Sequence, residues 1–238
     1  MKTSMRSLLA CVLLSSGLYS ATSSAAQTWD AAADFNVAQT GAWSYGWSAT
    51  LGGAFTQVTA PTFEYGMQWL QGQGATYVYN NPTSSALNPA GTIYAAPGVL
   101  AEHPGSGGQY AVVRWTAQQS GTYSVNAGFY GISAQGQATS TDVHVLKNGA
   151  SQFDGLVEGH WANENVRVGT SAPLTFALQA GDKVDFVVGY GSNGNYLYDS
   201  TRLTATIAAV PEPETYAMLL AGLGLMGGIA RRRKAKQA

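Results

Sequence analysis

The sequence predicts an all-β protein whose body is one antiparallel sandwich or barrel. Apolar and polar residues alternate with period 2 in several segments, Gly and Asn residues separate these segments, and no window keeps a helical period over three turns. The body is rich in Gly, Ser, Thr and aromatic residues and poor in charge, a composition typical of extracellular β proteins. Its length of about 180 residues is enough for one domain with a full core.

The first 26 residues have the three parts of a secretory signal peptide. Lys2 and Arg6 give a positive start, residues 8–14 form a short apolar stretch, and residues 24–26 offer small side chains for cleavage before Gln27. The single cysteine of the chain lies inside the apolar stretch. The mature chain is therefore expected to contain no cysteine and to be stable by packing alone.

The second half of the body carries the clearest strand patterns. Apolar residues alternate with polar ones in five segments there. Asn148 and Gly149 form a type I′ hairpin signal between two of these segments, and Gly181 with Asp182 marks another turn. The residues predicted to face the core are Tyr123, Val125, Ala127, Phe129, Val143, Val145, Leu174, Phe176, Leu178, Val184, Phe186, Val188, Leu203, Ala205 and Ile207.

Residues 174–207, LTFALQAGDKVDFVVGYGSNGNYLYDSTRLTATI, resemble the closing strands of galactose-binding-like jelly rolls. That group includes many carbohydrate-binding modules. In it, an apolar strand leads to an aGd turn, a strand, a Gly/Asn-rich loop and a last strand introduced by an Asp, the place that Asp199 takes here. The resemblance implies a single antiparallel β-sandwich, jelly-roll-like, over residues 27–208.

The chain closes with a Pro-Glu-Pro sequence, an uncharged stretch and an arginine cluster. The uncharged stretch, residues 216–230, would span about 23 Å as a helix, short of the roughly 30 Å hydrocarbon core of a bilayer. We expect a short transmembrane helix with the arginines on the cytoplasmic side, the alternative being a buried helix of a soluble fold. The residues concerned are Pro211, Glu212 and Pro213, and the anchor charges Arg231, Arg232 and Arg233.

The order of these parts resembles the PEP-CTERM sorting signal of Gram-negative bacteria, over residues 209–238. The resemblance implies an exosortase as processing enzyme, which cuts near the Pro-Glu-Pro after transient anchoring in the inner membrane. It also implies delivery to the cell surface or the extracellular matrix. A GxGxxG spacing in the same stretch does not indicate a nucleotide site, because no acidic residue follows it.

Charge excludes nucleic acid as a partner. Between Gln27 and Val210 the sequence holds five basic and eleven acidic residues, and the basic residues are scattered. A phosphate-binding protein needs a clustered basic face.

Aromatic residues in polar loops are the candidate ligand contacts. The apolar faces of sugars stack on aromatic rings, while sugar hydroxyls need short polar partners. Three loops mix both kinds of residue, and the alternative for each ring is a place in the core. The candidates are Trp43, Trp47, Trp161, Asn195, Tyr196 and Tyr198.

No cofactor is expected, although Asp199 could hold Ca²⁺ together with Asp142 or Asp182. The alternative for Asp199 is a hydrogen bond to the local backbone. The sequence contains no nucleophile elbow, no HExxH zinc motif and no EF-hand loop, and the three histidines show no metal spacing. His144 alternates with Val143 and Val145 in the pattern, which indicates a structural residue.

The sequence therefore favours an exported, non-catalytic protein of the cell surface or matrix that binds or organises exopolysaccharide. One alternative is a secreted glycan hydrolase, and another is a structural biofilm matrix protein without a defined ligand. The hydrolase would draw its acid and base from Glu64, Glu102, Asp154, Glu158 and Glu164.

Overall fold

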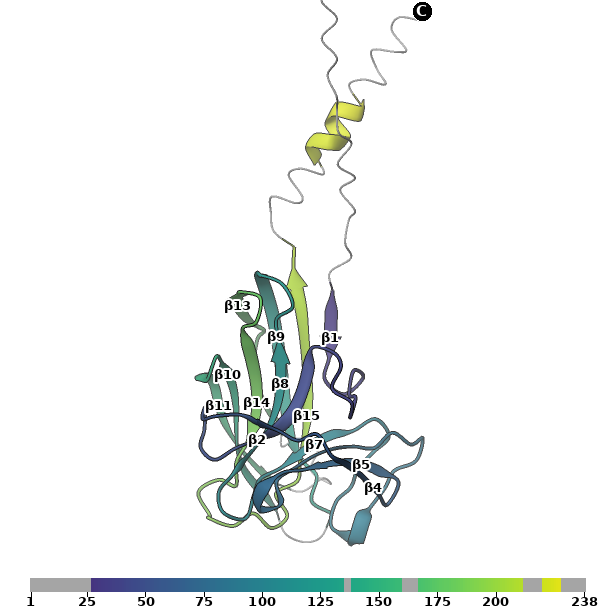
Figure 1. The fold of residues 1–238 in the computed structure, drawn as a ribbon, viewed down its shortest axis with the longest axis vertical. Helices are drawn as coiled ribbons and strands as arrows, with labels where there is room; N and C mark the ends of the chain where they lie inside the picture. The colour runs from purple at the N-terminus through teal and green to yellow at the C-terminus, as the bar shows by residue number, and fades with distance from the viewer. Residues whose placement is uncertain (1–26, 135–137, 160–166, 212–219, 228–238) are drawn as a thin grey trace, which may run out of the picture. The chain divides into compact units, whose positions relative to one another are not determined.

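The structure, a computed structural model, describes residues 27–134, 138–159, 167–211 and 220–227. The residues from Ala26 to Tyr216 belong to one compact unit, and the C-terminal helix belongs to another. In the described part of the first unit, the strands form two antiparallel sheets that pack as a sandwich (Figure 1). The predicted all-β fold class is confirmed.

The first sheet has nine strands within the described ranges, and every pairing in it is antiparallel. Its long strands β9 and β15 pair with each other, and the β4–β5 hairpin lies at the far end of the domain from β13 (Figure 1). In sheet order the strands are β12 (Arg167–Gly169), β9 (Gly121–Gly131), β15 (Thr201–Val210), β7 (Leu100–His103), β6 (Tyr77–Asn80), β5 (Met67–Gln71) and β4 (Pro61–Glu64). Off this path, β1 (Thr28–Asp30) pairs with β15, and β13 (Leu174–Leu178) pairs with β9.

The second sheet has six strands in the same described ranges and is also antiparallel. In order these are β11 (Ala150–Gly159), β10 (Thr139–Lys147), β14 (Lys183–Val188), β8 (Tyr110–Thr116), β2 (Trp43–Ser48) and β3 (Thr56–Gln57). Two 3₁₀ turns, η1 (Gln73–Ala75) and η2 (Pro89–Gly91), lie in the connections of the first sheet.

The main core fills the space between the two sheets, and the alternating residues predicted from the sequence supply most of it. Phe129 of β9 and Phe186 of β14 are fully buried there, as is Trp115 of β8. The ring of Trp115 makes edge contacts with Trp29 and Tyr123, each at 5.1 Å between centroids. Such edge-to-face packing is the favourable geometry for aromatic pairs.

The predicted turns have the backbone conformation that their residues favour. Asn148 and Gly149 both have positive φ, 50° and 83°, and close the β10–β11 hairpin as a type I′ turn requires. At the β13–β14 turn Gly181 has φ of 90°, and the amide of Asp182 donates to the carbonyl of Gln179. The first turn joins the paired strands β10 and β11, and the second leads from β13 of the nine-stranded sheet to β14 of the six-stranded sheet.

A short helix covers residues 220–227. None of the helices in the described ranges is long and apolar enough to cross a membrane. Both ends of the uncharged stretch lie outside the described residues, as do Glu212, Pro213, the three anchor arginines and the signal peptide. Pro211 directly follows β15 and is exposed. The domain boundaries 1–26, 27–208 and 209–238 stay a prediction.

Candidate functional site

The outer face of the first sheet carries a half-covered layer of aromatic side chains. Trp69 of β5 lies opposite Tyr79 of β6, which lies opposite Ala101 of β7. These residues face away from the main core, because the alternating neighbours Leu70 and Val78 point into it. The connection between β6 and β7 folds back over part of this face and buries Tyr79 and Ala101.

The uncovered part of the face is an open cleft of about 320 Å³. Strands β4, β5, β6 and β7 form its floor, and the η2 region forms one wall. Its lining is Thr62, Glu64, Tyr65, Trp69, Gln71, Tyr77, Tyr79, Pro89, Ala90, Thr92, Ile93, His103 and Ser200. A concave surface that combines aromatic and apolar side chains with a few polar groups is the usual form of a small-ligand site.

Four rings follow one another at this cleft, and we call them the aromatic row: Trp69, Tyr77 and His103 line the cleft, and Tyr196 contacts His103 beside it. Trp69 and Tyr77 lie 5.7 Å apart between centroids, Tyr77 and His103 6.0 Å, and His103 and Tyr196 5.8 Å. All three contacts are edge-on. The first three rings come from neighbouring strands, and the fourth comes from the Gly/Asn-rich loop before β15.

Hydrogen bonds fix the two ends of the aromatic row. The indole Nε1 of Trp69 donates to the backbone carbonyl of Glu64 at 3.1 Å, which orients the ring. At the other end, Asp199 Oδ1 accepts hydrogen bonds from the amide and hydroxyl of Ser140, at 2.8 and 3.2 Å. These bonds attach the loop that carries Tyr196 to β10 of the other sheet.

The row carries no positive charge at neutral pH. Burial lowers the pKa of His103 to about 4 against the opposing effect of the Pro104 and Ala75 backbone, so its ring is neutral. Burial, followed by the nearby Tyr196 and Glu64, raises the pKa of Tyr77. Glu102 is fully buried, and burial raises the pKa of its carboxyl well above the usual range. The remaining charge at the cleft is that of Glu64.

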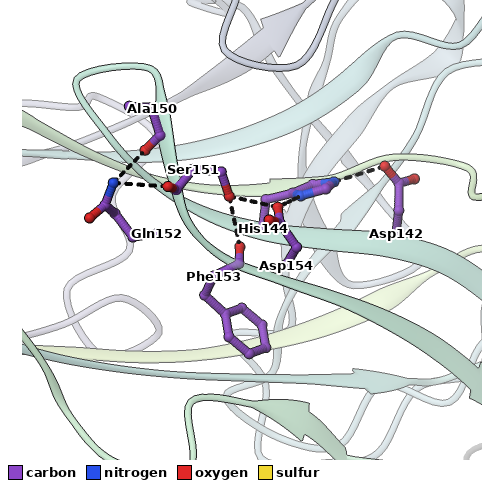
Figure 2. Close-up of polar contacts among 7 residues, drawn as sticks. All are labelled: Asp142, His144, Ala150, Ser151, Gln152, Phe153 and Asp154. Atoms are coloured by element: carbon purple, nitrogen blue, oxygen red, sulfur yellow. Dashed lines mark hydrogen bonds and ion pairs between the residues drawn. The ribbon is translucent and has the colours of Figure 1, made fainter.

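A second polar cluster lies on the outer face of the six-stranded sheet, centred on His144 (Figure 2). Nε2 of His144 lies 2.8 Å from Asp142 Oδ2, and Nδ1 lies 2.5 Å from Asp154 Oδ1. Both nitrogens can donate only in the charged imidazolium. Burial alone would lower the pKa of His144, but the two carboxylates outweigh it and raise the pKa.

This cluster does not have the geometry of a nucleophilic triad. The hydroxyl of Ser151 donates to Asp154 at 2.6 Å rather than to the imidazole, as Figure 2 shows. The second oxygen of Asp142 accepts from the amide of Gly191 at 2.7 Å. The cluster therefore joins β10, β11 and the start of the Gly/Asn-rich loop, which agrees with the structural role predicted for His144.

The predicted ligand residues fall in different places. Tyr196 is part of the aromatic row. Asn195 is exposed in the same loop, where its side chain accepts from the amide of Leu197. Tyr198 is half-buried with φ of 67°, and its carbonyl accepts from Thr139. Trp161 lies outside the described residues, and its contact with ligand stays a prediction.

The two tryptophans of β2 do not line the cleft. Trp43 is 3% exposed and packs in the main core, with its ring 6.0 Å from that of Phe186. Its place in the core, the alternative for each candidate ring, leaves no accessible face for a surface ligand. Trp47 is half-buried against Gly72, where an added Cβ would meet the indole at 2.4 Å. We therefore leave both out of the proposed site.

The acidic residues do not gather into a metal or hydrolytic site in the ranges that the structure describes. No group of three or more His, Cys, Asp or Glu side chains there is arranged to hold a metal. Asp182 lies at the opposite end of β14 from the loop that ends at Asp199. Burial is the main cause that raises the pKa of Asp199 to about 6, and the nearby charge of Asp142 adds to it. Asp199 Oδ2 is buried with no hydrogen-bond partner among the described residues, so calcium binding through Asp199 and Asp142 stays a prediction.

Sequence reasoning missed three rings of the aromatic row. Alternation places Trp69 on the same face of its strand as Gln71, and Tyr77 on the same face as Tyr79. It does not show which face of each strand is exposed to solvent. His103 was visible only as a residue before a Pro-Gly turn. The mixture of Trp, Tyr and Gln in MQWLQ and TYVYN is the signal that could have indicated a half-open face.

Three solved structures that are similar to parts of the chain share 12–15% sequence identity with it, at TM-scores of 0.27 to 0.33. A carbohydrate-binding module of family 51 from Clostridium perfringens, in complex with methyl-galactose, shares 13% identity over 65% of this chain and 95% of its own, with a TM-score of 0.33. A family 35 carbohydrate-binding module from Clostridium thermocellum shares 12% over 51% of this chain and 75% of its own, with a TM-score of 0.27. Pika GITRL shares 15% sequence identity over 43% of this chain and 74% of its own, with a TM-score of 0.27.

The chain is thus an all-β sandwich protein with a separate C-terminal segment. That segment is identified by sequence: residues 209–234 carry the PEP-CTERM protein-sorting motif. The motif implies export and sorting through the C-terminus. No curated protein matches the chain in sequence.

Proposed function

We propose that the exported chain is processed by an exosortase at Pro211–Pro213 and that its β-sandwich binds exopolysaccharide through the cleft, without catalysis. The observation that carries the binding part is the aromatic row. Its rings offer flat apolar surfaces along an open cleft, and Thr62, Gln71 and Glu64 beside them offer hydrogen-bond partners. A sugar presents the complementary surface, with apolar faces and peripheral hydroxyls.

The acidic residues favour binding over hydrolysis. Hydrolysis of a glycosidic bond normally needs two carboxyl groups on either side of that bond. Glu64 lines the cleft, whereas Glu102 is buried beneath the sheet and Asp154 and Glu158 lie on β11 of the other sheet. Glu164 lies outside the described residues. The described part of the chain therefore brings one of the five proposed carboxyl groups to the cleft.

Replacing rings of the row tests the proposal. Tyr196→Ala should weaken retention of the purified chain on the exopolysaccharide of its host by about fivefold or more. We place the stacking of a sugar at or below the low end of the roughly 1–3 kcal/mol measured for bases on aromatic rings. Trp69→Ala should have an effect of similar size.

Phe63→Ala is the matched control, because Phe63 is 66% exposed and alternates to the opposite face of β4 from Thr62 and Glu64. Binding that responds equally to Phe63→Ala and Tyr196→Ala would contradict the assignment of the cleft. Release of reducing ends by the purified chain, lost on Glu64→Gln, would replace the binding function by hydrolysis.

A further inference from the structure

The cleft has a definite charge sign. Among its lining residues Glu64 is the one carboxylic acid, and no Lys or Arg is present. Glu64 is exposed, so its carboxylate can meet a ligand directly. Its side chain makes no hydrogen bond or ion pair to another residue of the described ranges.

Four cations whose side chains the structure describes are engaged elsewhere. Arg202 on β15 lies over the ring of Tyr130, at 5.4 Å. Arg114 pairs with Asp185 on the other sheet. Lys147 and Lys183 donate to backbone carbonyls near the β13–β14 turn. None of these side chains lines the cleft, so none offsets the charge of Glu64 there.

Glu64 stands at one end of the aromatic row. Its carbonyl holds the indole of Trp69, and its charge contributes to the raised pKa of Tyr77. A carboxylate beside two aromatic rings is a suitable environment for an ammonium group. The ammonium can donate charge-assisted hydrogen bonds to the carboxylate and lie over an aromatic face.

We propose, resting on the function proposed above, that the cleft selects glycans with free amino groups, such as partly N-deacetylated amino-sugar polymers. Neutral glycans would stack on the row without the ionic contact. A uronic acid would place its carboxylate near Glu64 with no cation to pair it, an arrangement that disfavours binding.

Three oligosaccharides of equal length test this selectivity in equilibrium binding to the full chain: β-1,4-linked glucosamine, its N-acetylated counterpart and oligogalacturonate. We expect the glucosamine oligomer to bind about threefold to tenfold more tightly than the N-acetylated one, and oligogalacturonate to bind most weakly. Near 1 M salt, where the screening length is about 3 Å, the preference should shrink.

Glu64→Gln should remove the preference for the free amine, so that the glucosamine oligomer no longer binds more tightly than the N-acetylated one. Glu158→Gln, which alters an exposed acid on the other sheet, should leave the preference intact. If Glu64→Gln keeps the preference, or if oligogalacturonate binds as well as the glucosamine oligomer, the selectivity is overturned while glycan binding stands. If none of the three oligomers binds and Tyr196→Ala leaves matrix retention unchanged, both proposals fail.

Discussion

Arg114 and Asp185 form a two-point ion pair on the outer face of the six-stranded sheet. Nε of Arg114 donates to Oδ1 of Asp185 at 2.6 Å, and Nη2 donates to Oδ2 at 2.8 Å. The guanidinium also lies 4.2 Å from the centre of the Phe55 ring. The Asp185 side chain is 4% exposed and that of Arg114 is 17% exposed, so the pair is largely removed from water.

Asp185→Ala should destabilise the domain by about 2–3 kcal/mol, because it leaves the guanidinium half-buried without its partner. Chemical denaturation measures this as a lower midpoint at unchanged slope. The double change Arg114→Leu with Asp185→Leu should cost less than Asp185→Ala, since no unpaired charge remains. If the double variant is less stable than Asp185→Ala, the ion pair stabilises the folded domain by more than the cost of leaving Arg114 unpaired.

Phe186→Ala should cost about 3–5 kcal/mol as a large-to-small change in the core. Phe186 is fully buried between the sheets, with Trp43 at 6.0 Å. Thermal or urea unfolding measures the loss, with the exposed Phe63→Ala as a near-neutral reference. A small effect at Phe186 would contradict its assignment to the inner face.

His144→Gln should destabilise the domain in a pH-dependent way. The raised pKa of His144 means that its contribution is full below the ordinary value of 6.5 and is lost as the pH rises through the folded value. The lowered pKa values of Asp142 and Asp154 mean that their contribution is full above the ordinary 3.8 and is lost as the pH falls through the folded values.

The difference in melting temperature between wild type and His144→Gln should therefore be greatest between pH 3.8 and 6.5. It should shrink toward alkaline pH. Asp154→Asn should reduce this pH dependence, because it removes one of the two carboxylates that hold the imidazolium. A difference that stays constant from acidic to alkaline pH would mean that His144 is neutral in the cluster.

Protein recovered from the surface of the native host should lack both ends of the chain. Removal of the predicted signal peptide would take away the residues before Gln27. Cleavage at the sorting motif would take away the segment after the Pro-Glu-Pro. Intact-mass analysis measures both. A recovered species that retains residues 231–238 would mean that the C-terminal segment acts as an anchor that is not removed.

Local pattern was enough to predict five strands of the second half, β9, β10, β13, β14 and β15, together with two turns and the C-terminal motif. Apolar and polar residues alternate along β9 and β15. The apolar set therefore has to face the core, and this decides which side of each strand is buried. Asn148 and Gly149 tolerate positive φ, which few other pairs do. The sorting motif is contiguous, so no folding is needed to assemble it.

The binding face could not be predicted in the same way. Trp43 and Trp69 both lie in short strands among polar neighbours, yet one is in the core and the other lines the cleft. The difference is which side of each strand the opposite sheet covers, and that depends on contacts between residues far apart in the chain.

The sequence by itself determined the β class, the core alternation, the hairpin turns and the sorting motif, because each depends on residues that are neighbours in the chain. Only the tertiary structure decided that Trp69, Tyr77, His103 and Tyr196 form a row beside Glu64. Three strands and a distant loop supply these side chains, and the pairing of β5, β6 and β7 with the Ser140–Asp199 contact brings them together. Sheet register and loop anchoring are long-range contacts, and they decide which aromatic faces remain open to solvent.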